Sequence, residues 1–312
     1  MESPQNLKKR LKSVHNINQI TKAMELVSAT KMRKSQQIAL DSRPYAFAAL
    51  ELLANLTLLE NLKKEELPEL LRGRLTRLRQ GFGGRGKVLF VLVASDKGLA
   101  GAFNSSVFKK FEQHLKTNKE QRKNEEHFYL AVGEKANAYL AKKFRTMDSS
   151  MVLKKFAQVG DCTAPEQVAP LTEFIIKGYL DKKWDRVIII STHFRSALKQ
   201  EPHVRRVLPI DFDHIADTIK QIIPERGKFA DLIKEHSINF VPDKAKLKEY
   251  TIEPSSEKVL EKLAEHLFFM QVYHLILEAN ASEHSARRMA MKTASDNAAE
   301  LGNALNLQYN KS

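Results

Sequence analysis

The end of the chain, residues 254–312, reads PSSEKVLEKLAEHLFFMQVYHLILEANASEHSARRMAMKTASDNAAELGNALNLQYNKS. Apolar residues and two histidines recur in it at alternating spacings of three and four, and the stripe then shifts to a neighbouring face: Leu260, Leu263, Leu267, Met270, His274, Leu277, Ala281 and His284, then Met291, Ala294, Ala298, Leu301 and Leu305. Residues at these spacings share a helix face, so the segment predicts one long helix. At 1.5 Å per residue it would be about 80 Å long, which is more than one globular core needs.

The start of the chain predicts a second long helix. Residues 3–60 contain no glycine, and Ser3-Pro4 is typical of a helix start, because the serine side chain caps free N–H groups and proline fits the first turn. Two apolar stripes on neighbouring faces follow: Leu7, Leu11 and Val14, then Ile17, Ile20, Met24 and Val27. We expect a bend at Pro44. Both terminal helices are expected to protrude and to pair with each other.

The middle of the chain has the pattern of a small α/β domain. Residues 87–94 (KVLFVLVA), 128–132 and 186–192 (RVIIIST) are continuous apolar runs, as in strands that are buried on both faces of a sheet. Helical segments at 107–115, 135–143 and 165–180 lie between them, which predicts a doubly wound, Rossmann-like arrangement. We therefore divide the chain into a helix over 1–60, a basic connector over 61–86, an inserted α/β domain over 87–250 and a helix over 251–312.

Two glycine-containing loops resemble ligand-binding motifs. GFGGRGK at 81–87 lacks the Ser or Thr of a P-loop, because Val88 stands there, and it precedes a strand instead of following one. We interpret it as a flexible basic linker. SDKGLAG at 95–101, with Asp96, Gly98 and Gly101, lies where open α/β sheets bind ligands. It lacks a full G-x-G-x-x-G pattern, and a tight turn of small residues is the simpler interpretation.

Other polar groups do not assemble into a recognisable site in the sequence. Asp211, Asp213 and His214 follow an expected strand end at Pro209-Ile210 and are interpreted as surface residues. Cys162 is the only cysteine, which excludes an intrachain disulfide framework and a multi-cysteine zinc site. We expect no catalytic residue, no cofactor and no metal. No apolar run reaches the roughly 18 residues of a membrane span, and no signal segment is visible.

The charge of the chain is basic and unevenly distributed. Lys and Arg number 51 against 37 Asp and Glu, a net charge of +14, and residues 1–43 are rich in Lys and Arg whereas 254–312 are nearly neutral. The paired helices should therefore carry a basic stripe, which is either an ordinary solvated face or a surface for nucleic acid phosphates or for an acidic protein. A basic coiled coil that binds nucleic acid is the alternative function.

The two chain ends and one loop resemble a known family. ITKAMELVSATKMRKSQ at 20–36 and SEHSARRMAMKTASDNAAELGNALNLQYNK at 282–311 resemble the terminal helices of the gamma subunits of F-type ATP synthases, and SDKGLAGAFN at 95–104 is similar to that family's motif after its first strand. The resemblance implies a non-catalytic central rotor stalk. Its terminal helices would form an antiparallel coiled coil inside a ring of three alpha and three beta subunits, and its rotation would couple proton flow to ATP synthesis at sites on the beta subunits.

The resemblance also implies partners and contact residues. The inserted domain would be a foot that contacts the epsilon subunit and the membrane-embedded c-ring, at the cytoplasmic face of a bacterial inner membrane. The expected contacts with the beta-subunit lever loops are Lys22, Met24, Lys31, Arg33, Lys34 and Arg287. Family members usually continue past the position of Lys311 with an Arg-Gln pair that engages a beta subunit, whereas this sequence stops at Ser312; torque and coupling are therefore expected to be affected more than assembly.

Overall fold

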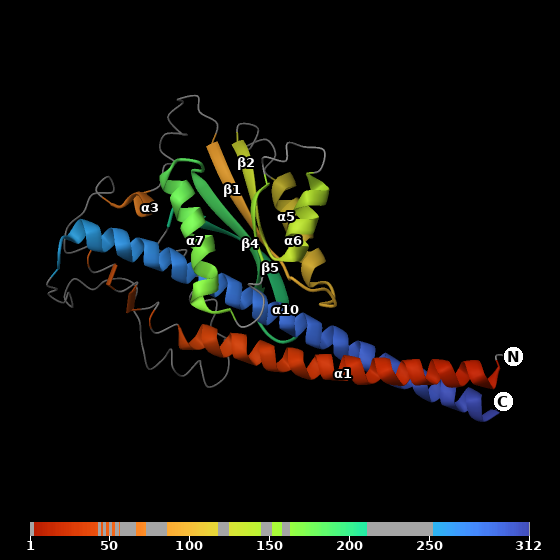
Figure 1. Cartoon of the computed structure of the whole chain (residues 1–312). Coiled ribbons are helices and arrows are strands. Elements are labelled where there is room, and N and C mark those ends of the chain that lie inside the picture. Colours follow the sequence, from red (N-terminus) through yellow and green to blue (C-terminus); the bar gives the residue numbers. More distant parts are fainter. Residues whose placement is uncertain are drawn as a thin grey trace.

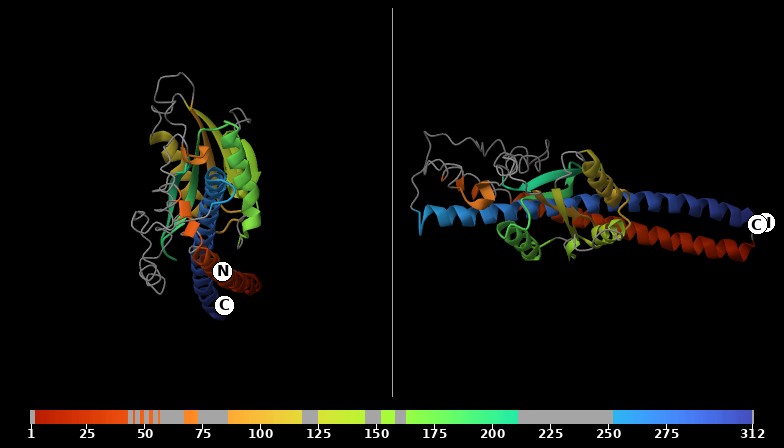
Figure 2. Two further views of the ribbon diagram at one scale, coloured as in Figure 1. Left: turned by 90° about the vertical axis from the view of Figure 1, so that its left-hand side faces the viewer. Right: turned by 90° about the horizontal axis from the view of Figure 1, so that it is seen from above.

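The computed structural model describes residues 3–42, 67–72, 86–117, 125–144, 152–157, 163–210 and 252–311, and six single residues between 45 and 56. Two long helices lie side by side as a shaft, and a twisted sheet with its covering helices stands against part of it (Figure 1). The two chain ends meet at the free end of the shaft, which extends well beyond the sheet (Figures 1 and 2).

The shaft consists of α1 (Pro4–Asp41) and α10 (Ser256–Lys311). Ser3 caps α1, its Oγ accepting from the Asn6 N–H at 3.4 Å, as the Ser3-Pro4 pair predicts. The helices run antiparallel, since Leu7 and Val14 of α1 cluster with Leu305 and Ala298 of α10. Buried residues of α1 recur every seventh position, at Leu7, Val14, Thr21, Ser28 and Ser35. This is the heptad spacing of a coiled coil, and it confirms the predicted pairing.

The sheet has the strand order β3-β2-β1-β4-β5. Its parallel strands are β1 (Gly86–Val93), β2 (Glu125–Val132), β3 (Val152–Phe156) and β4 (Arg186–Phe194), and β5 (Gln200–Leu208) pairs antiparallel with β4. The linking helices are α5 (Phe103–Thr117), α6 (Glu134–Lys143) and α7 (Pro165–Leu180). The predicted α/β class and its three helical segments are confirmed. β3 was not predicted because its central residues, Leu153, Lys154 and Lys155, are exposed and polar apart from the leucine.

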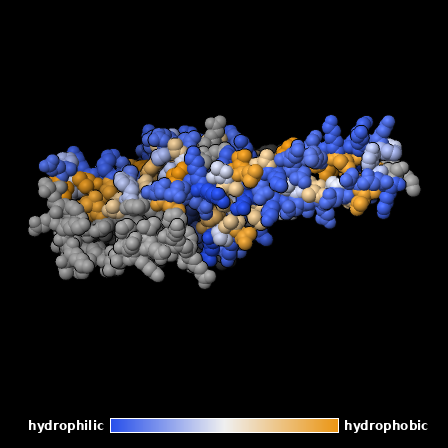
Figure 3. Space-filling model, turned by 90° about the horizontal axis from the view of Figure 1, so that it is seen from below, coloured by the Kyte–Doolittle hydropathy of each residue, from blue (hydrophilic) through white to orange (hydrophobic). Residues whose placement is uncertain are grey.

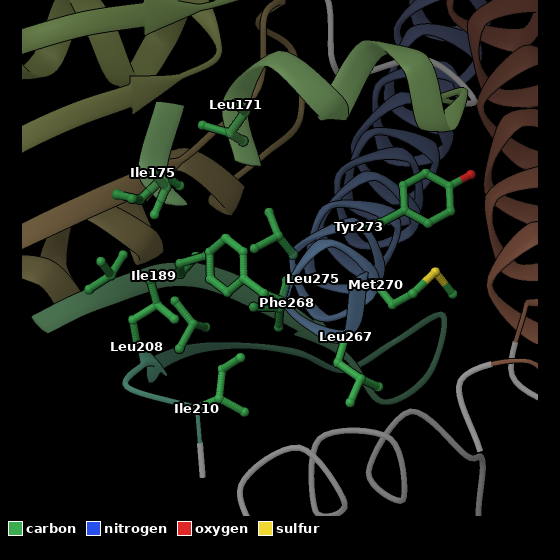
Figure 4. Close-up of a cluster of buried hydrophobic side chains, with 14 of the residues drawn as sticks. Leu171, Ile175, Ile189, Leu208, Ile210, Leu267, Phe268, Met270, Tyr273 and Leu275 are labelled. Carbon is green, nitrogen blue, oxygen red and sulfur yellow. The ribbon is translucent and has the colours of Figure 1, made fainter. Parts of the chain in front are cut away.

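Both faces of the sheet are covered, which explains the continuous apolar runs of β1 and β4. On one face Val88, Phe90 and Leu92 pack with Val107 and Phe111 of α5 and with residues of α6. On the other face Leu89, Val91 and Val93 belong to a core that includes α7 and α10. Figure 4 shows Leu171 and Ile175 of α7, Ile189 of β4 and Phe268 and Leu275 of α10 converging in this second core. Alternate residues of one strand therefore face two different helix layers.

α10 has two halves with different surroundings. Residues 270–285 are all buried, so this part of the helix is a core element of the sheet domain and not a protruding arm. Beyond Arg287 burial returns to a stripe, with Met291, Ser295, Ala298 and Leu305 facing α1. The prediction that both helices protrude is therefore wrong for the first half of α10 and right for the second. The periodicity of apolar residues could not predict this difference between the two halves, because it does not show which element covers a buried helix face.

Several sequence-based expectations fall outside the described residues. The expected bend at Pro44, Cys162, Asp211, Asp213 and His214 are among them, as is most of the connector over 61–86. Within that connector the short helix α3 (Glu69–Arg72) buries Leu70 and Leu71, and the Leu70 carbonyl accepts from the Ile210 N–H at 2.8 Å. None of the helices described combines the length and apolar character that a membrane crossing requires.

Candidate functional site

The sequence-predicted residues gather where the shaft meets the sheet domain. A cleft of about 770 Å³ opens between α1, α10 and the turn over residues 95–101, and five of the predicted residues line it: Met24, Lys31, Asp96, Gly98 and Arg287. The other four do not: Lys22, Arg33 and Lys34 are exposed elsewhere on α1, and Gly101 faces α10. The cleft lies at the edge where the parallel strands end, since residues after β1, β2 and β3 line it.

The turn after β1 is built by local polar bonds and two left-handed residues. Asp96 accepts from the Glu134 N–H at 3.0 Å and thereby caps the start of α6. Leu99 and Gly101 have φ angles of 61° and 55°. A Cβ on Gly101 would lie 3.8 Å from the Cβ of Ala290, so the turn approaches α10 closely. The small residues therefore serve a tight turn, which agrees with the simpler interpretation of SDKGLAG.

The left-handed conformation of Leu99 is uncommon for a residue with a branched side chain. Its side chain is 66% exposed and lines the cleft. The turn thus holds a large apolar group in water at its tip, beside α1.

Arg287 fixes this turn to the shaft. Its guanidinium donates to the Gly98 carbonyl oxygen from Nε at 3.3 Å and from Nη2 at 3.2 Å, and to the Lys97 carbonyl oxygen at 3.3 Å. Nη2 also binds the Glu283 carboxylate at 2.6 Å. Arg287 is only 8% exposed. The side chain that was expected to support a partner contact is thus engaged with its own chain, and a role toward a partner stays a prediction.

The structure adds a buried ionic cluster that the sequence analysis missed. Glu278 of α10 is 4% exposed, and its Oε2 lies 3.2 Å from Nδ1 of His193 in β4 and 3.4 Å from Nη1 of Arg205 in β5. Burial, and then the nearby Arg205 and His193, lower the pKa of His203 from its usual range. The sequence feature that could have indicated this cluster is Glu278, a single acidic residue within the largely apolar segment LILEANA. Its partners could not be identified, because they lie about 75–85 residues away in sequence.

The cleft's acidic groups already have structural tasks. Asp96 caps α6, Glu283 pairs with Arg287, and Glu134 pairs with Lys155 at 3.0 Å. Among the residues that the structure describes, no group of three or more His, Cys, Asp or Glu side chains is placed to hold a metal ion. The polar groups of this junction therefore attach the turn after β1 to α10 and to the start of α6.

The outer face of α1 carries a second apolar stripe. Ile17, Ile20 and Val27 are each more than half exposed, on the face beside the contact with α10. Lys22, Arg33 and Lys34 are also exposed on this helix. Figure 3 shows apolar surface between charged side chains along the shaft. A helix with an exposed apolar stripe and basic flanks is suited to contact a partner that is apolar and acidic.

Comparisons with known proteins agree with this arrangement. A family model described as ATP synthase matches residues 3–312. The ATP synthase gamma chain of Roseiflexus sp. (strain RS-1) is 31% identical over 311 residues, with 100% of this chain and 92% of the relative covered. The ATP synthase gamma chain of Opitutus terrae is 35% identical over 312 residues, with the same coverage.

Solved structures show the same fold. The central stalk and c-ring structure of the Tetrahymena thermophila mitochondrial ATP synthase contains a chain with a TM-score of 0.55 and 22% identity, covering 88% of this chain and 99% of that one. A rotor chain of the Euglena gracilis mitochondrial ATP synthase has a TM-score of 0.55 and 14% identity, covering 99% and 96%. Nothing in these comparisons supports the nucleic-acid alternative. The chain belongs to the ATP synthase gamma chain family.

Proposed function

We propose that this chain is the central rotor stalk of a proton-translocating F-type ATP synthase. The shaft would turn inside a ring of three alpha and three beta subunits, and the catalytic sites would lie on the beta subunits. The observation that carries this proposal is the free shaft, in which α1 and the second half of α10 pair beyond the sheet domain. A stiff projecting helix pair can reach into a ring and transmit rotation, which a globular domain cannot.

The exposed stripe on α1 is the proposed contact with the beta subunits. Ile17, Ile20 and Val27 supply apolar contact area, and Lys22, Arg33 and Lys34 supply positive charge for acidic lever loops. Exposed ion pairs contribute only about 0–1 kcal/mol each. Contacts this weak can be broken and remade as the shaft rotates, whereas a tight complex would hold it at one angle. Met24 and Lys31 line the cleft together with Val27 of the stripe, and they would take part in the same contact.

The sheet domain is the proposed foot of the rotor. It would bind the epsilon subunit and the c-ring, which places the complex at the cytoplasmic face of a bacterial membrane. The position of the domain supports this assignment, because it stands away from the free end of the shaft where the chain termini lie (Figure 1). The termini would then point into the alpha–beta ring and the foot toward the membrane sector.

Reconstitution tests the function directly. The chain is mixed with alpha and beta subunits of a bacterium that has a related gamma chain, and native mass spectrometry and ATP hydrolysis are measured on the same sample. One copy bound per three alpha and three beta subunits, with stimulated hydrolysis, is the expected result. The absence of such a complex, together with a salt-dependent shift of a DNA or RNA probe, would contradict the proposal and favour the nucleic-acid alternative.

A pair of variants tests the contact surface. Ile20→Asp with Val27→Asp places acid on the stripe and is expected to lower the stimulation of hydrolysis at least about tenfold, the effect of losing roughly 1.4 kcal/mol of contact energy. Leu153→Asp makes the same kind of change at an exposed position of β3, away from the shaft, and is expected to leave hydrolysis unchanged. Equal effects of both changes would contradict the assignment of the stripe.

A further inference from the structure

The buried half of α10 is attached to the sheet domain by polar contacts at three places, which lie on two sides of the helix. On the first side the Tyr273 hydroxyl donates to the Thr163 carbonyl oxygen at 3.0 Å, and Asn280 Nδ2 donates to Thr163 Oγ1 at 2.8 Å. Thr163 lies just before α7. Tyr273 and Asn280 are seven residues apart, two turns of a helix, and so lie on the same face of α10.

The second side of α10 holds the hairpin formed by β4 and β5. Glu278 binds His193 and Arg205, and Ser285 Oγ donates to the Ala197 carbonyl oxygen at 2.7 Å. These two helix positions are again seven residues apart. At 100° per residue they point roughly 140° away from Tyr273 and Asn280.

The third attachment of α10 holds the turn after β1. Glu283 and Arg287 form an ion pair at 2.6 Å, and the guanidinium reaches the carbonyl oxygens of Lys97 and Gly98. The Ala290 side of the helix contacts Gly101 of the same turn. Arg287 lies seven residues after Asn280 and so shares its face of α10. Because attachments on two nearly opposite faces resist both sliding and turning of a rod about its axis, α10 cannot rotate independently of the sheet.

α1 is held differently. Its contacts with other described elements are made chiefly along α10, through one stripe that includes Thr21, Ser28 and Ser35. Side-chain bonds join Ser295 to Asn18 at 3.0 Å and Ser42 to His274 at 3.4 Å. On the side toward the turn after β1, the cleft separates α1 from the sheet domain. A helix that contacts only one other helix, along one stripe, moves with that helix but transmits little torque directly to the sheet domain.

We propose that torque passes between the sheet domain and the shaft through α10, at the three attachments between Tyr273 and Arg287, and that α1 is carried along by α10. This inference rests on the proposed rotor function and goes beyond it by assigning the mechanical connection within the chain. Buried and partly buried hydrogen bonds suit this task, because water competes less for their partners and each resists displacement in a defined direction.

The test measures torsional stiffness in the assembled complex. The alpha–beta ring is fixed to a surface, a bead is attached to the foot at a Lys116→Cys position on α5 in a Cys162→Ser background, and angular fluctuations are recorded while the ring is stalled. Lys116 is exposed. Fluctuation variance is inversely proportional to the stiffness of the connection between foot and ring. The test variant, Tyr273→Phe with Ser285→Ala, removes two hydroxyl groups from two sides of α10 and leaves its shape almost unchanged.

The expected result is an increase in variance of at least about 1.5-fold for this variant, since it removes one buried and one partly buried bond between α10 and the sheet domain. The matched control, Thr30→Ala with Thr293→Ala, removes two exposed hydroxyl groups that bond only within their own helices, and it should leave the variance unchanged. An unchanged variance in the first variant, or an equal increase in the control, would overturn the inference. Tyr273→Phe alone serves if the double variant unfolds. A wild-type chain that forms no rotating complex would instead contradict the proposed rotor function.

Discussion

The guanidinium of Arg287 on α10 lies 3.2 Å from the carbonyl oxygen of Gly98, a residue 189 positions earlier in the chain. This one side chain closes the turn after β1 onto the shaft and neutralises Glu283 beside it. The contact joins the two parts of the molecule at the point where rotation would pass from one to the other. It also explains why the turn can hold Leu99 in a left-handed conformation, because Arg287 binds the carbonyl oxygens of the two preceding residues, Lys97 and Gly98.

Replacing Arg287 should destabilise the chain strongly. Arg287→Ala removes the guanidinium that pairs with the buried Glu283 carboxylate, and breaking a buried pair costs about 3–5 kcal/mol. Arg287→Lys keeps the charge but loses the forked geometry, so its effect should be intermediate. Urea unfolding of the three proteins measures this order. Arg288→Ala, at the next and more exposed position, should change stability by less than about 0.5 kcal/mol, and an equal loss there would refute the assignment.

Two glycines beside the cleft should respond differently to alanine. Gly133 has a φ of 93°, and a Cβ would lie 2.1 Å from the Ala94 carbonyl oxygen, so the backbone must shift. A Cβ on Gly98 would meet nothing closer than Lys135 Cε at 4.0 Å. Gly133→Ala should therefore cost more than about 2 kcal/mol. Gly98→Ala should be nearly neutral in thermal unfolding, and a large loss at Gly98 would contradict the described turn.

Gly302 offers a stabilising substitution in the shaft. It lies inside α10, and a Cβ there would meet Val14 Cγ1 at 3.7 Å, an ordinary contact distance. Alanine favours a helix over glycine by about 0.8–1 kcal/mol, so Gly302→Ala should raise the free energy of unfolding by a similar amount. Helix content measured by circular dichroism on heating tests this prediction. A loss of stability would mean that an added Cβ at Gly302 has less room beside Val14 than this 3.7 Å distance indicates.

The stability of the fold should decrease in mild acid. Burial lowers the pKa of His266 below the ordinary value of 6.5, and burial together with Arg205 and His193 lowers that of His203. As the pH falls below 6.5 the unfolded chain binds protons before the folded chain does, so stability is lost until the lowered folded pKa has been passed.

The pH prediction is checked by melting temperatures at about pH 7.5 and about pH 5.5. His266→Gln cannot titrate in this range and should reduce the difference between the two temperatures. His15→Gln is the matched control, because His15 lies on the exposed face of α1 and should leave the difference unchanged. A rise in stability on acidification would contradict the burial of both histidines.

The sequence alone was enough to determine two kinds of element: the long helices, which satisfy their own backbone hydrogen bonds, and the strands that are buried on both faces. The apolar residues Leu7 and Val14 of one helix and Met291, Ala298 and Leu305 of the other lie in the seam of the shaft, because a helix pair repeats its contacts every seven residues. The predicted Leu301 is exposed instead, and the middle of the α1 seam consists of Thr21, Ser28 and Ser35. The runs at 87–94 and 186–192 show strands buried on both faces. The turn over 95–101 could be placed at the end of a strand, since small residues there follow an apolar run directly.

Only the tertiary structure decided how α10 is used and what its polar residues bind. Whether its first half protrudes or enters the core depends on which surface covers it, and a periodic pattern contains no such information. Arg287 and Glu278 find their partners at Gly98, His193 and Arg205, all far away in sequence. These groups meet only in the folded sheet, because the strand order brings β4, β5 and the turn after β1 next to α10. The junction of shaft and sheet is therefore a property of the folded chain.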